Sequence, residues 1–362
     1  MKRIYFVFAY FCVFTVFGQH KFPIKIQDFS DQYEAIIEKL DNYKLIQTKD
    51  DKYLAPYVIR IKNKKDGKQV LESYSRDLPY DVIKENNEAS ANIKELPYGT
   101  QSVLIYEDFN FDGKKDLALM SGYHSCYGGP AFNIYLAKSD GFEFSPTFAE
   151  LGHNYCGMFH VNEKDEILHT MMKSGCCWHE YSDFRVIDNQ PKIVKAITFD
   201  YTYASGQLPI KETLTSWENS QPTETTRYLL AYDDDLDVLV TFELQRNKKR
   251  VVVFAIEDVM YYALEQSDGA VEFYFPEAYY DENRSETIYK PFTFDTVEKT
   301  LRFQNEDALY TLYETKNSVG IKVLVDGKTY DLKGLRSSLS GSLNIFDVQS
   351  LDEVHWKNLK FE

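Results

Sequence analysis

The stretch Ile105-Tyr-Glu-Asp-Phe-Asn-Phe-Asp-Gly-Lys-Lys-Asp-Leu-Ala-Leu119 places two short apolar segments on either side of a loop that is rich in carboxylates. Apolar, β-branched and aromatic residues such as those in the flanking segments favour strands. The loop carries Gly113, which allows the main chain to turn sharply. The stretch therefore predicts a strand, a tight loop and a second strand.

Similar short apolar segments, separated by turn residues, recur along most of the chain. An alternating segment at 57–62 precedes Asp66-Gly67, and Asp326-Gly327 predicts another tight turn between strands. Strands spaced by about 8–14 residues predict an all-β fold of mainly antiparallel sheets, either propeller-like or a sandwich. The other predicted strands are 101–106, 116–120, 132–137, 158–161, 167–172, 181–187, 238–244, 250–256, 271–275, 300–303, 309–314, 320–325 and 329–332.

One segment near the N-terminus has helical spacing. Ser30 is a suitable N-cap residue, and the apolar residues that follow it lie three and four positions apart. We therefore expect a short N-terminal helix over 30–43. Its apolar stripe consists of Tyr33, Ile36, Ile37, Leu40 and Tyr43.

The first residues have the pattern of a signal peptide. Lys2 and Arg3 precede an apolar run over 4–17, and Gly18 supplies a small residue where cleavage would occur. The run is shorter than the roughly 20 apolar residues that a membrane span needs. We expect a signal peptide at 1–18, no membrane span, and a periplasmic or secreted mature protein.

The chain of 362 residues is long enough for two domains. A polar stretch over 213–226, which includes Pro222, interrupts the apolar pattern. We expect a first β domain at 19–205 and a second β-rich domain of unassigned role at 206–362.

The formal net charge of −15 limits the partners. Nucleic acid and anionic membrane surfaces would be repelled, whereas a cationic protein or Ca²⁺ would be attracted. The alternative interpretation is that the acidic residues serve solubility alone.

The loop at 108–116 has the spacing of a calcium site. Alternate side chains of a tight loop can face one centre, and Ca²⁺ prefers several oxygen ligands. Leu119 stands at the twelfth position, where an EF-hand has glutamate, so we expect a strand-loop-strand site; a structural turn without metal is the alternative. The predicted ligands are Asp108, Asn110, Asp112 and Asp116, together with the main-chain carbonyl of Lys114. A second acidic run at 233–237 lacks a following glycine and predicts a solvated turn.

Four cysteines follow the leader, and an even number in an exported protein favours disulfides. Because neighbouring cysteines pair only with strain, we expect Cys176 and Cys177 to bond with Cys126 and Cys156, in an order that the spacing leaves open.

Zinc is the competing interpretation for these cysteines. His124, His153 and His179 lie close in sequence to cysteines, and both residue types are usual zinc ligands. None of the cysteine pairs has the C-x-x-C spacing of structural zinc sites.

The sequence contains no G-x-S-x-G, H-E-x-x-H or glycine-rich phosphate-binding motif. We therefore assign no catalytic residues and do not expect an enzyme. A hydrolase that uses a pair of carboxylates is a third possibility that sequence spacing does not test.

Residues 103–194 resemble a family of exported bacterial proteins related to invertebrate-type lysozyme inhibitors. The family includes xanthomonad periplasmic immunity proteins against a peptidoglycan hydrolase delivered by type IV secretion. The matching segments are 105–119, Tyr127-Gly-Gly-Pro-Ala-Phe-Asn-Ile-Tyr-Leu136 and Gly141-Phe-Glu-Phe-Ser-Pro146.

This resemblance implies antiparallel blades, the calcium loop described above, and inhibition of a peptidoglycan hydrolase by a loop that enters the cleft of the enzyme. The candidate partner-binding residues are Ser121, Gly122, Tyr123 and Tyr127, whose spacing departs from the Ser-Gly-x-Tyr of the family. An ordinary connection between strands is the alternative for this segment. For the whole protein, the alternative function is a calcium-stabilised module that binds glycans or another envelope protein.

Overall fold

The structure of the chain is a computed structural model. It describes residues 22–27, 29–47, 52–84, 86–96, 99–201, 210–218, 221–230, 236–281, 285–347 and 356–362. The expected signal peptide at 1–18, the expected domain boundary after residue 205, and most of the second acidic run lie outside the described residues.

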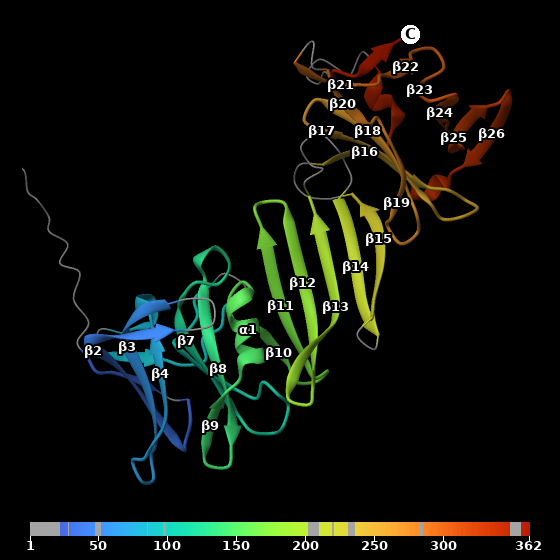
Figure 1. Cartoon of the computed structure of the whole chain (residues 1–362). Coiled ribbons are helices and arrows are strands. Elements are labelled where there is room, and N and C mark those ends of the chain that lie inside the picture. The colour runs from blue at the N-terminus through green and yellow to red at the C-terminus, as the bar shows by residue number, and fades with distance from the viewer. Residues whose placement is uncertain are drawn as a thin grey trace, which may run out of the picture. The chain divides into compact units, whose positions relative to one another are not determined.

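The chain forms two compact units, and each is described by itself. Unit one comprises residues 1–171 and 184–192, and unit two comprises 172–183 and 193–362. Both units consist mainly of antiparallel strands, so the predicted all-β class is confirmed (Figure 1). Within the described ranges, no helix is long and apolar enough to cross a membrane.

The first sheet of unit one has the strand order β4-β3-β2-β1-β5. The hairpin predicted at Asp66-Gly67 joins β3 to β4, and Gly67 has a positive φ of 68°. The elements of this part are β1 (Ile24–Gln27), β2 (Tyr33–Gln47), β3 (Lys52–Asn63), β4 (Gln69–Ser75), the 3-10 turn η1 (Tyr80–Val82) and β5 (Glu88–Ser90).

The predicted N-terminal helix over 30–43 is wrong, because this segment is strand β2. Ala35 and Ile37 are buried and face Ile61 and Ile59 of β3. Their separation of two residues is the period of a strand, and β-branched residues such as Ile37 pack well there. The hydroxyl of Ser30 accepts hydrogen bonds from neighbouring amides without capping a helix.

The second sheet of unit one has the order β6-β7-β8-β9 and carries the acidic loop. Leu117, Leu119, Phe132 and Ile134 are completely buried in it. Its elements are β6 (Leu104–Glu107), β7 (Asp116–Tyr123), the 3-10 turn η2 (Cys126–Gly128), β8 (Pro130–Lys138) and β9 (Gly141–Phe144).

A short helix, α1 (Pro146–Asn154), packs beside β8 (Figure 1). We did not expect this helix from the sequence. Pro146 occupies the first turn, where its missing N–H costs nothing. Phe148 is fully buried, and Gly152 allows the helix to approach the main chain of Phe132.

Three strands that follow have residues in both units. They are β11 (Ile167–Ser174), β12 (Trp178–Ile187) and β13 (Gln190–Asp200). Before them, β10 (His160–Asn162) pairs with the unit-one part of β11 and places His160 opposite His169.

The polar stretch at 213–226 contributes residues to two paired strands. In unit two it forms most of a hairpin of β14 (Ile210–Glu218) and β15 (Gln221–Leu229). Threonine, which favours strands, recurs through both. Pro222 is tolerated because β15 is the last strand of its sheet, where a missing N–H does not break the ladder.

The rest of unit two contains two larger sheets, β19-β18-β17-β16-β27 and β26-β25-β24-β23-β22-β28, and the pair β20-β21. The predicted strands 238–244 and 250–256 correspond to the antiparallel pair β16 and β17, and the expected Asp326-Gly327 turn joins β25 to β26. The strands are β16 (Asp237–Glu243), β17 (Arg250–Ile256), β18 (Val259–Glu265), β19 (Val271–Phe275), β20 (Ala278–Asp281), β21 (Glu286–Tyr289), β22 (Phe292–Asp295), β23 (Thr300–Asn305), β24 (Ala308–Glu314), β25 (Val319–Val325), β26 (Lys328–Lys333), β27 (Ser340–Gly341) and β28 (Leu359–Phe361). Two 3-10 turns, η4 (Arg336–Ser338) and η5 (Leu343–Phe346), complete it.

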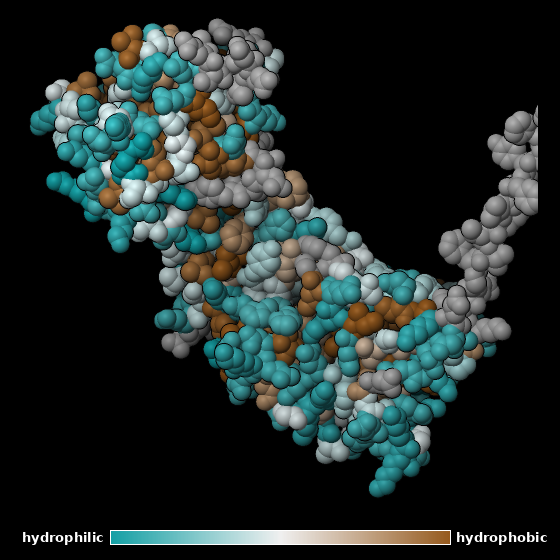
Figure 2. Space-filling view, turned by 180° about the vertical axis from the view of Figure 1, so that it is seen from behind, coloured by the Kyte–Doolittle hydropathy of each residue, from teal (hydrophilic) through white to brown (hydrophobic). Residues whose placement is uncertain are grey.

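Aromatic rings fill the main core of unit two. The rings of Phe275 and Phe303 stack with centroids 4.5 Å apart, and Tyr262 packs against Phe303 at 4.9 Å. On the face shown in Figure 2, hydrophobic residues lie among hydrophilic ones.

The close approach of α1 to β8 gives a test of this packing. A Cβ at Gly152 would lie 2.6 Å from the main-chain oxygen of Phe132. Gly152→Ala should therefore lower the free energy of unfolding by about 1–3 kcal/mol, although alanine favours helices. Calorimetry and amide exchange of α1 would measure the change.

Glu150→Ala is the matched control, because Glu150 is exposed on the same helix. It should change the stability by less than about 0.5 kcal/mol. A Gly152→Ala protein as stable as this control would contradict the packing.

Candidate functional site

The acidic loop between β6 and β7 is organised by its own amides. One carboxylate oxygen of Asp108 accepts a hydrogen bond from the amide of Gly113 at 2.8 Å, and the other accepts from the amide of Asp112 at 3.2 Å. Gly113 has a φ of 83° and Phe111 a φ of 60°. The glycine meets the left-handed conformation without a side-chain clash.

The side chains of Asn110 and Asp112 also have partners. The Asn110 amide nitrogen donates to the side-chain oxygen of Asn189 at 3.0 Å, which ties the loop to the turn that follows β12. Asp112 accepts a hydrogen bond from the amide of Lys114 at 2.9 Å. These contacts orient the two side chains within the loop.

Asp116 connects the loop to the sheet. Its carboxylate is completely buried, and its two oxygens accept hydrogen bonds at 2.8 Å from the amides of Phe109 and Ala137. Burial raises the pKa of the Asp116 carboxyl to about 6, although the two hydrogen bonds oppose the rise; the charges of Asp108 and Asp112 add to it.

The structure thus brings the predicted calcium ligands into one loop. Their oxygens are of the chemical type that Ca²⁺ prefers, so the donor set fits the ion. However, within the described part of the chain, no three His, Cys, Asp or Glu side chains are grouped closely enough to hold a metal. Side chains that now face loop amides would have to turn towards the ion.

The predicted partner-binding residues fall into two classes. Ser121 and Gly122 are buried in β7, whereas Tyr123 is 40% exposed and Tyr127 is 64% exposed. The two tyrosines are thus the members of this set that a partner can reach. Tyr127 lies in η2 with a φ of 54°.

A disulfide fixes this segment. Cys126 of η2 bonds with Cys156, which follows α1, and their Cα atoms are 4.8 Å apart. The predicted pairing of Cys126 and Cys156 with Cys176 and Cys177 is therefore wrong.

The other disulfide joins the neighbours Cys176 and Cys177. They lie in the turn between β11 and β12, where Gly175 has a φ of 63°. We expected adjacent cysteines not to bond with each other. In this turn, the backbone conformation next to Gly175 accommodates the bond between Cys176 and Cys177. All four cysteines are paired, which favours disulfides over zinc and is consistent with an exported protein.

Two of the histidines that were considered as zinc ligands lie close together. The rings of His124 and His153 are 5.2 Å apart, and His153 Nε2 lies 3.2 Å from the side-chain oxygen of Asn133. Burial, followed by the neighbouring His124, lowers the pKa of His153 to about 4. Its imidazole is therefore neutral at pH 7.

These histidines line a pocket of about 620 Å³ in unit one that the sequence did not reveal. Its residues come from separated segments of the chain, so no local pattern indicated it. Beyond those two histidines and Asn133, the wall includes Tyr53, Tyr74, Tyr135, Phe144, Ser121, Glu72 and Glu150.

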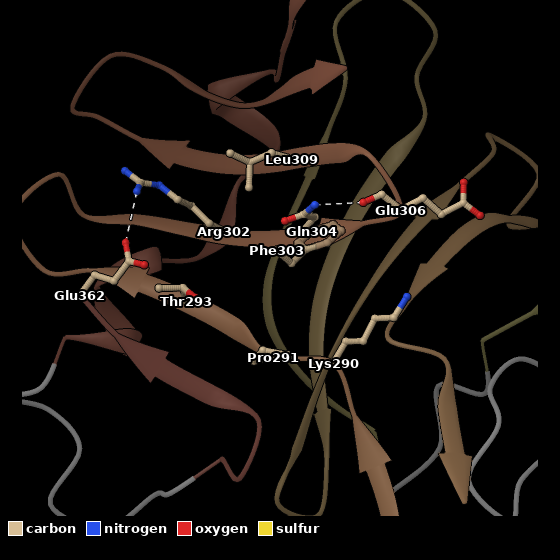
Figure 3. Close-up of a pocket in the computed structure, with 9 residues that line it drawn as sticks. All are labelled: Lys290, Pro291, Thr293, Arg302, Phe303, Gln304, Glu306, Leu309 and Glu362. Atoms are coloured by element: carbon tan, nitrogen blue, oxygen red, sulfur yellow. Dashed lines mark hydrogen bonds and ion pairs between the residues drawn. The ribbon is translucent and has the colours of Figure 1, made fainter. Parts of the chain in front are cut away.

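Unit two has a separate hollow of about 590 Å³, drawn in Figure 3. Phe303 and Leu309 contribute apolar surface to it. Arg302 pairs with Glu362 at 3.5 Å and with Asp295 at 2.7 Å, so the charge of this arginine is already compensated. We assign no role to this hollow.

No protein-family model matches the sequence, and no curated protein matches it. Among solved structures, a Xanthomonas type IV secretion system related protein is 16% identical, with a TM-score of 0.41 over 54% of this chain and 90% of that chain. TolB from Acinetobacter baumannii is 11% identical, with a TM-score of 0.20 over 84% of this chain and 64% of that chain. These likenesses are too slight to carry an argument about function.

The two disulfides should differ in their effect on stability. The Cys126–Cys156 bond spans 30 residues, so its closure restricts the unfolded chain. Replacing both cysteines with alanine should lower the free energy of unfolding by roughly 3–4 kcal/mol, as measured by calorimetry.

The double replacement of Cys176 and Cys177 is the matched control. This bond joins neighbours and closes almost no loop, so its loss should cost less than about 1 kcal/mol. If the two double replacements lowered the free energy of unfolding equally, the proposed difference between the disulfides would be wrong.

Proposed function

We propose that this protein is an exported, calcium-binding inhibitor of a lysozyme-like peptidoglycan hydrolase, and that it acts by occluding the substrate cleft of the enzyme. The observation that supports it most directly is the exposure of Tyr123 and Tyr127 on a segment that the Cys126–Cys156 bond restrains. The family resemblance of residues 103–194 indicates the kind of target.

Restraint of this segment would favour binding. A flexible loop loses conformational entropy when it enters a cleft, whereas a restrained loop has lost most of it beforehand. Tyrosine is well suited to such a contact, because its ring offers apolar surface and its hydroxyl a hydrogen bond.

The net charge of −15 would attract a cationic hydrolase before the two proteins touch. Complementary charge raises the rate at which two proteins meet, so a cationic hydrolase would associate faster than a neutral one. The attraction should weaken as salt is added.

Calcium would act on the neighbouring loop. An ion held by Asp108, Asn110, Asp112, Asp116 and the Lys114 carbonyl would offset the repulsion between the carboxylates. Asp116 already ties this loop to β8 through Ala137. Binding at the loop would thus stiffen the sheet from which the tyrosine segment extends.

The inhibitory role is tested with Tyr127→Ala. Loss of the most exposed aromatic ring in the segment should weaken inhibition of a susceptible hydrolase by roughly tenfold or more, because exposed tyrosines at interface centres are frequent hot spots. A turbidity assay of cell-wall lysis against a panel of lysozymes, at micromolar protein, measures it.

Tyr330→Ala is the control, since Tyr330 is 51% exposed in unit two, outside the proposed segment. It should inhibit as well as the unchanged protein. Undiminished lysis by every hydrolase in the panel would refute the proposal.

Calcium binding is tested by titrating Ca²⁺ into the metal-stripped protein at pH 7, above the pKa of Asp116. We expect heat on binding and a rise in melting temperature, equivalent to about 2.7 kcal/mol when calcium is at a hundred times its dissociation constant. Asp112→Asn should weaken binding at least about tenfold, because it removes one charge from the loop.

Asparagine at position 112 can still accept the hydrogen bond from Lys114, so the metal-free stability should remain unchanged. Asp140→Asn, in the exposed turn between β8 and β9, is the control and should leave the affinity intact. A melting temperature indifferent to calcium, with no heat of binding, would exclude the site.

A further inference from the structure

The pocket of unit one is a separate feature from the acidic loop and the tyrosine segment. Its volume of about 620 Å³ lies within the range of roughly 300–1,000 Å³ that is usual for small-molecule sites. Its wall comes from the ends of β2 and β3, from β4, from β7 to β9, and from α1.

Two aromatic rings give the pocket a defined apolar surface. Tyr135 is buried, and its hydroxyl donates to Ser73 at 2.9 Å, which fixes the ring. Phe144 meets it edge to face with centroids 5.6 Å apart. Phe144 is nevertheless 46% exposed, so its ring can take a further flat, weakly polar surface.

Three polar side chains of the pocket, Asn133, His153 and Ser121, are oriented by hydrogen bonds. Asn133 and His153 hold each other at 3.2 Å, and the neutral imidazole offers one donor and one acceptor in total. The Ser121 hydroxyl donates to the carbonyl of Ala131 at 3.1 Å and lies 3.3 Å from His124. These contacts orient the Ser121 hydroxyl at the wall of the pocket.

The charges of the pocket discriminate against an anion. Among the described residues that line the pocket there is no lysine or arginine to attract an anion. Glu72 is already engaged by Arg60 and by the Tyr74 hydroxyl.

For a cationic ligand, Glu150 is the remaining acidic side chain of the wall, and two of the aromatic rings are already in contact with cations of the protein. Arg76 lies 4.3 Å from the ring centre of Tyr53, and Lys44 lies 5.8 Å from that of Tyr74, so these two rings are less open to a cation of the ligand than Phe144 is. A neutral ligand requires no charged partner.

We propose that this pocket binds a neutral saccharide, with one sugar ring against Phe144 and its hydroxyl groups hydrogen-bonded to Asn133 and His153. A pyranose combines a flat C–H face with a rim of hydroxyls, and this combination matches an exposed ring beside a neutral amide and a neutral imidazole. The site does not depend on the inhibitory role, because it uses neither Tyr123 nor Tyr127.

Calorimetric titration of the full chain with neutral disaccharides tests the proposal. The probes are N,N′-diacetylchitobiose, cellobiose, maltose and lactose, with glucosamine as a cationic comparison and glucose 6-phosphate as an anionic one. Saturable binding of at least one neutral disaccharide, and none of the two charged sugars, is the expected result. Absence of saturable binding by all four disaccharides, or equal binding of a charged sugar, would overturn it.

Two substitutions test whether the sugar binds in this pocket. Phe144→Leu keeps apolar volume but removes the ring, and should weaken the affinity by up to roughly tenfold. Phe361→Leu is the matched control, because Phe361 is 43% exposed in unit two, and should have no effect. Binding unchanged in Phe144→Leu would overturn the assignment to this pocket.

A third variant and a second assay separate this proposal from the inhibitory one. Asn133→Asp has nearly the same shape but loses the N–H donors of the amide, so it should reduce the affinity for the sugar while the melting temperature shows that the protein folds. Phe144→Leu should inhibit lysis as well as the unchanged protein does. Loss of sugar binding with inhibition intact would support two sites, whereas retention of full affinity in Asn133→Asp would count against the pocket.

Discussion

The buried carboxylate of Asp116 joins the acidic loop to the sheet of unit one. One oxygen holds the amide of Phe109, at the start of the loop, and the other holds the amide of Ala137 in β8. A buried carboxylate is stable only when such donors replace the water that it has lost. The hydrogen bonds do not fully replace the lost water, because burial still raises the pKa of Asp116 to about 6.

Strand β8 connects the acidic loop with the helix α1 and with the pocket. It is bound to the loop through Ala137, packs against α1, and contributes Asn133 and Tyr135 to the pocket. Strand β7, paired with β8, leads into the segment of Tyr123 and Tyr127. A calcium ion at the loop, a partner at the tyrosines and a sugar in the pocket would therefore all act on one small sheet.

The two disulfides have different parts in this arrangement. Cys126–Cys156 connects the tyrosine segment to the chain after α1 and restricts the unfolded state. The Cys176–Cys177 bond joins adjacent residues, so it hardly lowers the conformational entropy of the unfolded chain. It restrains only the turn between β11 and β12. The proposed functions reside in unit one, and for unit two the structure defines an aromatic core and a hollow whose arginine is already paired.

Local sequence determined those features that depend on neighbouring residues. The strands β17 (Arg250–Ile256) and β19 (Val271–Phe275) have the predicted bounds, because their apolar segments are short and end at turn residues. The turn at Asp326-Gly327 and the loop between β6 and β7 were also predicted from the sequence. Glycine and aspartate are among the residues that adopt left-handed conformations most easily, and such conformations occur at Asp326, Gly327 and Gly113.

Tertiary structure decided what depends on distant residues. Segment 30–43 satisfies both the helical and the strand period, and pairing with Ile59 and Ile61 of β3 selected the strand. The partner of Cys126 was set by the place at which α1 ends. The pocket unites segments more than a hundred positions apart, such as those of Ile46 and Asn154. Local preferences act over a few residues, whereas strand pairing, disulfides and cavities depend on which surfaces the folded chain brings together.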